Sequence, residues 1–185
     1  MRKLIFALFT SGLLVAAAPP PAGPARPDGR TSAISGFGAT NTPPGAHERP
    51  DPGLRYRILF NVTVGADDPA NVSPTLNRVA RLLNLLADDG IRPAPGDVVA
   101  IVHGGATTAI MSDRAYVART GVVTNPNLVL IERLRAAGVV VAVCSQALHA
   151  HDVAVGDVSP LVRVDVSALI TLSNLQLRGY ALIPD

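Results

Sequence analysis

Residues 139–148 read Val-Val-Val-Ala-Val-Cys-Ser-Gln-Ala-Leu. The first five are apolar without interruption, which is typical of a short strand that is covered on both faces. The run ends at Cys144, and a short helix is expected over 145–150. Because a strand covered on both faces needs helices on both sides, this segment indicates an α/β protein with a parallel sheet.

The rest of the chain from Arg55 onward repeats this alternation. Further strands are predicted at 58–62, 98–102, 162–166 and 180–183. Ser73-Pro74 caps and opens a helix that ends at Gly90, and Asn125-Pro126 opens another that ends at Gly138. Weaker helical patterns lie within 107–118 and over 167–177. This order predicts a mainly parallel sheet in an α/β sandwich with right-handed crossovers.

Two segments precede this domain, which we place at 54–185. Residues 1–17 have a basic start and an apolar run too short to span a bilayer, which favours a signal peptide with Ala18 as the first mature residue. An uncleaved membrane anchor is the alternative. Residues 18–53 hold nine of the sixteen prolines and are expected to form a linker or arm. Ile34 and Phe37 suggest that part of it docks on the domain.

The charge balance excludes several partners. Of the sixteen Lys and Arg residues, Arg2 and Lys3 lie in the leader, and the other fourteen balance fourteen Asp and Glu. A neutral chain without Trp argues against binding nucleic acid, and we expect no membrane association after leader cleavage. The single Cys excludes an internal disulfide. The expected location is periplasmic or secreted.

Two chemically active residues follow predicted strands, where parallel sheets place their ligands. These residues are His103 and Cys144. The short helix after Cys144 favours a thiolate, the nucleophile for sulfur transfer, disulfide exchange or peroxide reduction. The alternative is a packed cysteine, since cysteine is among the most buried residue types.

The histidines leave further alternatives open. His103-Gly104-Gly105 is either a ligand-binding turn or an ordinary strand-to-helix turn. His149 and His151, with His103 and Cys144, would supply metal ligands, but their spacing matches no standard motif. We therefore expect no metal, and we interpret His149 as solvent-facing or as a partner that tunes the thiol.

The ordered set of these motifs resembles the DsrE/DsrF-like proteins of the DsrEFH superfamily over residues 55–185. The matching segments are Val102-His103-Gly104, Asn125-Pro126-Asn127-Leu128, the Cys144 turn, Ser167-Ala168-Leu169 and Gly179 to Pro184. The resemblance is strongest to exported members that carry a leader and an arm with a Gly-aromatic-Gly element, here Gly36-Phe37-Gly38.

This resemblance implies a three-layer α/β/α sandwich with a mainly parallel five-stranded sheet. It implies homo-oligomers, commonly trimers or hexamers, and a persulfide carried on Cys144. His103, Gly104 and Gln146 are expected to line the pocket. Ser145 departs from the glycine expected beside the cysteine. No organic cofactor is implied, whereas sulfur donor and acceptor proteins are.

The sequence therefore predicts an exported sulfur carrier that uses Cys144, and it leaves open whether the protein is an enzyme in its own right. Export is a departure from the relay members, which work in the reducing cytoplasm, because a lone reactive thiol tends to oxidise in an oxidising compartment. The alternative function is a non-catalytic oligomeric module that binds a small molecule or a partner at the same sheet edge.

Overall fold

The structure is a computed structural model that describes residues 32–185. The predicted leader at 1–17 and residues 18–31 of the predicted arm lie outside the described residues. Within them, the strands are β1 (Ile58–Val62), β2 (Val98–Val102), β3 (Val140–Cys144), β4 (Arg163–Asp165) and β5 (Ala181–Ile183). The α-helices are α1 (Pro74–Asp88), α2 (Asp113–Thr120), α3 (Asn127–Ala136), α4 (Ser145–Ala150) and α5 (Ala168–Leu177). Two 3₁₀ helices, η1 (Gly104–Ile110) and η2 (Val155–Asp157), complete the order.

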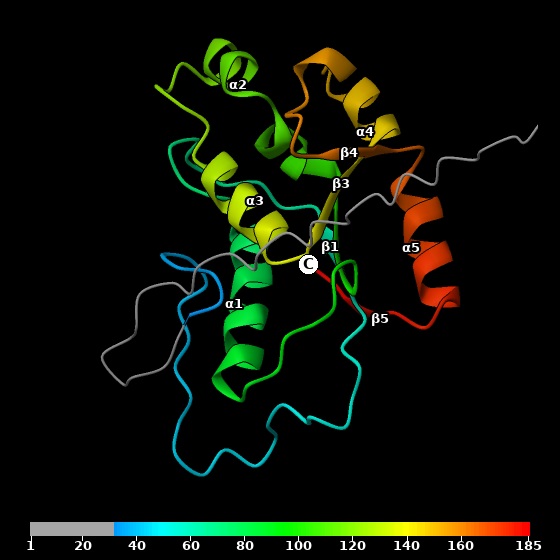
Figure 1. Cartoon of the computed structure of the whole chain (residues 1–185). Coiled ribbons are helices and arrows are strands. Elements are labelled where there is room, and N and C mark those ends of the chain that lie inside the picture. The colour runs from blue at the N-terminus through cyan, green and yellow to red at the C-terminus, as the bar shows by residue number, and fades with distance from the viewer. Residues whose placement is uncertain (1–31) are drawn as a thin grey trace, which may run out of the picture.

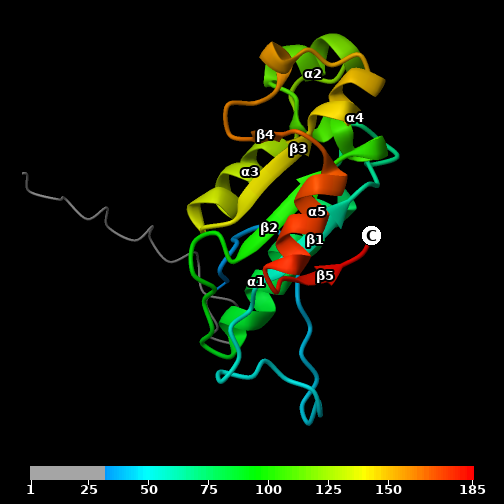
Figure 2. The ribbon, with the colours of Figure 1, turned by 90° about the vertical axis from the view of Figure 1, so that its right-hand side faces the viewer.

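The strands form one sheet in the order β4-β3-β2-β1-β5, and every pairing is parallel. Helices α1 and α3 lie on one side of this sheet and α5 lies on the other, as Figures 1 and 2 show. The predicted α/β sandwich with a five-stranded sheet is thus confirmed, and the sheet is parallel throughout.

Alternating strand residues supply two separate apolar layers. In β2, Val98, Ala100 and Val102 belong to the larger core under α1 and α3. Val99 and Ile101 belong to a smaller cluster that also includes residues of α5. Because both sets of side chains are buried, β2 reads as a continuous apolar run.

Serine side chains cap the starts of α1 and α5, and Ser73 is the cap that the sequence predicts. The Ser73 hydroxyl accepts a hydrogen bond from the Leu76 N–H at 3.4 Å, and the Ser167 hydroxyl accepts one from the Leu169 N–H at 3.1 Å. These bonds satisfy amide donors that have no partner inside the helix. They fix where α1 and α5 leave the sheet.

Two predicted elements differ from the structure. The single helix expected within 107–118 is wrong: the segment divides into η1 and α2 at Met111, which is extended and forms an antiparallel bridge with Val158. Ser112 then caps α2 by accepting from the Ala115 N–H, which restarts the helix. The strand expected at 162–166 is shorter, Arg163–Asp165, and among the described strands it lies at the edge of the sheet and pairs only with β3.

The described part of the arm packs against α1. Ile34 is only 1% exposed, and its N–H donates to Asn84 Oδ1 at 2.8 Å. The Asn84 amide in turn donates to the carbonyls of Phe37 and Gly38 at 2.9 and 3.0 Å. Arg133 of α3 lies over the Phe37 ring, 5.3 Å from its centre. Buried Asn84 thus satisfies several backbone groups of an irregular segment that belongs to no sheet.

Within residues 32–185, none of the helices has the length and apolar character that a membrane span requires.

Candidate functional site

The ends of three neighbouring strands bring polar side chains together. Val102 pairs with Val143 across β2 and β3, so the next residues, His103 and Cys144, are neighbours at the carboxyl edge. Cys144 itself pairs with Asp165 of β4. Residues in register on adjacent strands project to the same face, which here is the α5 face. The two residues that the sequence singled out at strand ends therefore share one edge and one face.

Cys144 is a free thiol in a covered position. It is 5% exposed and lies in the smaller apolar cluster with Ala142, Ala147 and Ala168. The turn before α5 lies close by, because the Ser145 hydroxyl donates to the Val166 carbonyl at 2.8 Å. A reagent that reaches the sulfur must displace part of this cover.

His103 is held by a polar residue of the neighbouring strand. Its Nε2 lies 2.7 Å from Oδ1 of Asn61. Since an amide oxygen only accepts, the proton of this bond is on Nε2, and Nδ1 of the neutral ring carries a lone pair. Burial lowers the pKa of His103, and the negative charge of Asp185 opposes this only in part. The ring is therefore neutral at pH 7.

The two glycines after His103 allow two turns to approach each other. Gly104 has a φ of 56°, in the left-handed region. A Cβ at Gly104 or Gly105 would lie 3.4 or 3.3 Å from the Thr63 carbonyl oxygen. That carbonyl accepts from the Ala106 N–H at 2.9 Å. The absence of a side chain at Gly104 therefore lets the turn after β2 pack against the turn after β1. Both turns lie next to His103.

The other predicted site residues lie further out. Gln146 is exposed on α4, and its amide donates to the Val166 carbonyl at 3.3 Å. His149 is exposed in the last turn of α4, and half-buried His151 follows that helix. Among residues 32–185, no three His, Cys, Asp or Glu side chains are grouped to hold a metal ion.

Sequence reasoning missed Asn61 and Asp165. Asn61 is the only polar residue in the run Ile-Leu-Phe-Asn-Val, and that position was the available signal. Asp165 carried no comparable signal, because its place beside Cys144 depends on which strand pairs with β3. Its carboxylate accepts from the Arg163 guanidinium and the Thr171 hydroxyl, both at 2.7 Å.

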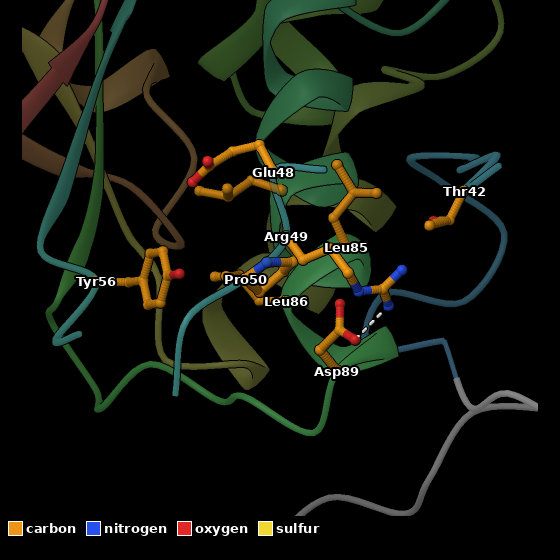
Figure 3. A pocket seen from close by; sticks show the side chains of 9 residues that line it. Thr42, Glu48, Arg49, Pro50, Tyr56, Leu85, Leu86 and Asp89 are labelled. Carbon is orange, nitrogen blue, oxygen red and sulfur yellow. Dashed lines mark hydrogen bonds and ion pairs between the residues drawn. The ribbon is translucent and has the colours of Figure 1, made fainter. Parts of the chain in front are cut away.

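A pocket of about 310 Å³ lies elsewhere, between the arm and α1. Figure 3 shows Arg49 and Asp89 joined by a dashed line, with Leu85, Leu86 and Tyr56 among the lining side chains. A nitrogen of the Arg49 guanidinium lies 2.5 Å from Asp89 Oδ1. It adjoins the carboxyl-terminal half of α1, whereas Cys144 follows the carboxyl end of β3. This pocket therefore does not belong to the edge that carries Cys144 and His103.

Comparison with known proteins identifies the class to which this fold and site belong. The model of the DsrE/DsrF-like family matches residues 57–184, and the chain belongs to that family. Membership suggests a function related to sulfur relay in general. No curated protein matches the chain. Among solved structures, it is similar to the protein of unknown function MTH1491 from Methanobacterium thermoautotrophicum, with 20% identity and a TM-score of 0.49. That match covers 70% of this chain and 99% of the other.

Proposed function

We propose that this protein is a sulfur carrier that holds sulfur as a persulfide on Cys144. The observation that carries the proposal is the position of the only cysteine at the carboxyl end of β3, beside His103, in a chain of this family. Ligands of open parallel sheets gather at such an edge.

The transfer conserves atoms and electrons. The Cys144 thiolate attacks the outer sulfur of a donor persulfide, R–S–SH, and a new S–S bond forms. The donor's own S–S bond breaks, and the donor leaves as the thiolate R–S⁻. The product is Cys144–S–SH, and an acceptor thiolate removes the outer sulfur by the same exchange. No cofactor takes part, so a donor and an acceptor protein are required.

His103 supplies a neutral imidazole next to Cys144 in this proposal. With Nε2–H donated to Asn61, the Nδ1 lone pair is available for the proton that the thiol loses. Gln146 stands at the exposed start of α4 and is proposed to meet the donor first. His149, exposed one turn further along α4, is assigned no role in the transfer.

The burial of Cys144 favours a second candidate function. A thiol that is 5% exposed in an apolar cluster is also what a packed cysteine looks like. In that case the protein is a non-catalytic module that binds a small molecule or a partner at the same edge. Native-state access to the thiol distinguishes the two functions.

Intact-mass analysis tests the carrier function. The protein is exposed to polysulfide or thiosulfate, whose sulfane sulfur can be transferred to a thiolate, with and without a reductant. Sulfide alone serves as the negative control, because it cannot form a persulfide without an oxidant. A gain of sulfur that a reductant removes is expected for the wild type and not for Cys144→Ala. In parallel, alkylation of the Cys144 thiol is measured with and without denaturant. No sulfur adduct, together with a thiol that is labelled only after unfolding, would replace the carrier with the binding module.

We further propose that the protein is exported and that residues 1–17 are removed. The basic start and short apolar run at 1–15 support this. The amino-terminal sequence of the protein recovered from the extracytoplasmic fraction tests it. A start at Ala18 is expected, and recovery of the intact Met1 form in the cytoplasmic fraction would contradict it.

We also propose that the protein assembles as a homo-oligomer, as the family resemblance implies. The support is the surface around α5, where large apolar side chains are exposed: Val166, Leu169, Ile170 and Leu177, at 53–87%. A helix with apolar residues on its outer side is more often covered than left in water.

A further inference from the structure

The side chain of Asp185 lies in a cluster of hydrogen-bond donors at the carboxyl end of β1. Its Oδ2 accepts from the Thr63 N–H at 2.5 Å, the Thr63 hydroxyl at 2.6 Å and the Val64 N–H at 2.7 Å. Its Oδ1 accepts from the Thr75 hydroxyl, and an Arg78 guanidinium nitrogen lies 3.9 Å away. Two backbone amides, two hydroxyls and a cation thus converge on one carboxylate.

These donors require an acceptor. Thr75 is 2% exposed, so its hydroxyl would be buried without a partner if nothing accepted from it. Burial is the largest single effect and raises the pKa of Asp185, but hydrogen bonds from Thr63, Thr75 and Val64 together outweigh it and hold that pKa below its ordinary value. The donors around Asp185 therefore favour a negatively charged group at this position, whether it is the Asp185 carboxylate or another anion.

Asp185 follows β5, which is a short strand at the edge of the sheet. β5 has three residues and pairs only with β1 within the described chain. The segment after it is tied back by a 3.3 Å bond from Arg78 to the Pro184 carbonyl and by the Asp185 side chain itself. In Figure 2 the chain end that carries Asp185 lies beside β1 and β5, at the surface of the molecule.

We propose that Thr63, Val64, Thr75 and Arg78 form an oxyanion-binding site that Asp185 occupies as an internal substitute, and that an external oxyanion binds when Asp185 leaves. The ligand carries at least two terminal oxygens on one centre, as a carboxylate or a sulfate-like ion does, because Asp185 uses both of its oxygens. Backbone amides and an arginine are the donors that proteins use for such groups. The site is at the end of β1, and its four residues include neither Cys144 nor His103, although the charge of Asp185 acts on His103. The inference therefore does not depend on the carrier function.

Removing the internal occupant tests the proposal. Sulfate, thiosulfate and acetate are titrated separately, by calorimetry at constant ionic strength, into wild type and Asp185→Ala. Asp185→Ala is expected to bind one of the three anions about tenfold or more tightly than wild type, because its site is no longer filled. Preference for acetate identifies a carboxylate-bearing ligand, and preference for sulfate or thiosulfate identifies a free tetrahedral ion. Equal affinity in the two proteins would overturn the proposal.

Two further variants locate the binding. Adding Arg78→Gln to Asp185→Ala is expected to abolish the gain, and the amide resonances of Thr63 and Val64 are expected to shift when the anion is added to Asp185→Ala. Asp165→Ala is the matched control, because Asp165 is also held by an arginine and a threonine but accepts no backbone amide within residues 32–185. A gain that survives Arg78→Gln, or that also appears in Asp165→Ala, would show binding elsewhere. Should Asp185→Ala fail to fold, Asp185→Asn replaces it, with a smaller gain expected.

Discussion

Nε2 of His103 and Oδ1 of Asn61 lie 2.7 Å apart, although the two residues are 42 positions apart in the chain. The contact joins the end of β2 to a polar position inside β1. It fixes the protonated nitrogen of the ring on the Asn61 side. Nδ1, the other nitrogen of the neutral ring, then carries a lone pair.

The lowered pKa of His103 predicts a stability that falls with acidification. The folded state binds a proton at His103 less readily than the unfolded state, whose histidine pKa is about 6.5. The contribution of His103 is therefore fully present above about pH 6.5 and is lost as the pH falls below it. Thermal unfolding at pH 7.5 and pH 5.5 is expected to show a smaller drop in His103→Gln than in wild type.

Exposed His149 provides the matched control, since His149→Gln removes a histidine from the surface of α4. It is expected to leave the pH dependence at the wild-type level. An equal reduction in both variants would mean that burial of His103 is not the cause.

The stabilities of two Cys144 variants show whether water reaches the side chain at this position. Cys144→Ala removes one small apolar group and is expected to cost about 1 kcal/mol of unfolding free energy. Cys144→Ser places a hydroxyl in the same apolar cluster and is expected to cost about 1–3 kcal/mol more. Urea unfolding measures both. If serine proves no worse than alanine, the sulfur is in contact with water, and the displacement of cover expected above is unnecessary.

Gly38 holds the arm close to α1. A Cβ there would lie 2.3 Å from the Arg81 backbone nitrogen and 2.4 Å from the Ala80 carbonyl carbon. Gly38→Ala is therefore expected to destabilise the protein by about 3 kcal/mol or more, through steric overlap added to the strain of a positive φ. Gly45→Ala is the control, because Gly45 also has a positive φ but no atom within 4 Å of its added Cβ. It is expected to cost only about 1–2 kcal/mol. Equal losses of unfolding free energy in the two variants would mean that the arm shifts away from α1 without a measurable cost.

The oligomer proposal predicts an assembly that depends on α5. Light scattering after size exclusion is expected to give a multiple of 19.1 kDa for the full chain, less the leader if it has been removed. Leu169→Glu with Leu177→Glu is expected to reduce it to a single chain, because two charges would enter an apolar contact. Val123→Glu, which changes a 93% exposed residue between α2 and α3, serves as the control. A wild-type monomer would exclude the homo-oligomer.

The sequence by itself determined most of the elements and the placement of His103 and Cys144 at strand ends. Apolar runs such as Val98–Val102 and caps such as Ser73 are local signals, and they act over a few neighbouring residues. The wrong prediction within 107–118 has a local cause as well, since the Ser112 side chain caps α2 and starts a new helix after extended Met111.

Only the tertiary structure decided what surrounds those strand ends. Asn61 meets His103 across 42 positions, and Thr63 meets Asp185 across 122. Part of the cover over Cys144 comes from α5, which follows it in the chain and returns to the sheet face. These contacts depend on strand order and register, which place distant residues at hydrogen-bonding distance. No periodicity in the sequence encodes them, because each partner's local pattern is compatible with several neighbours.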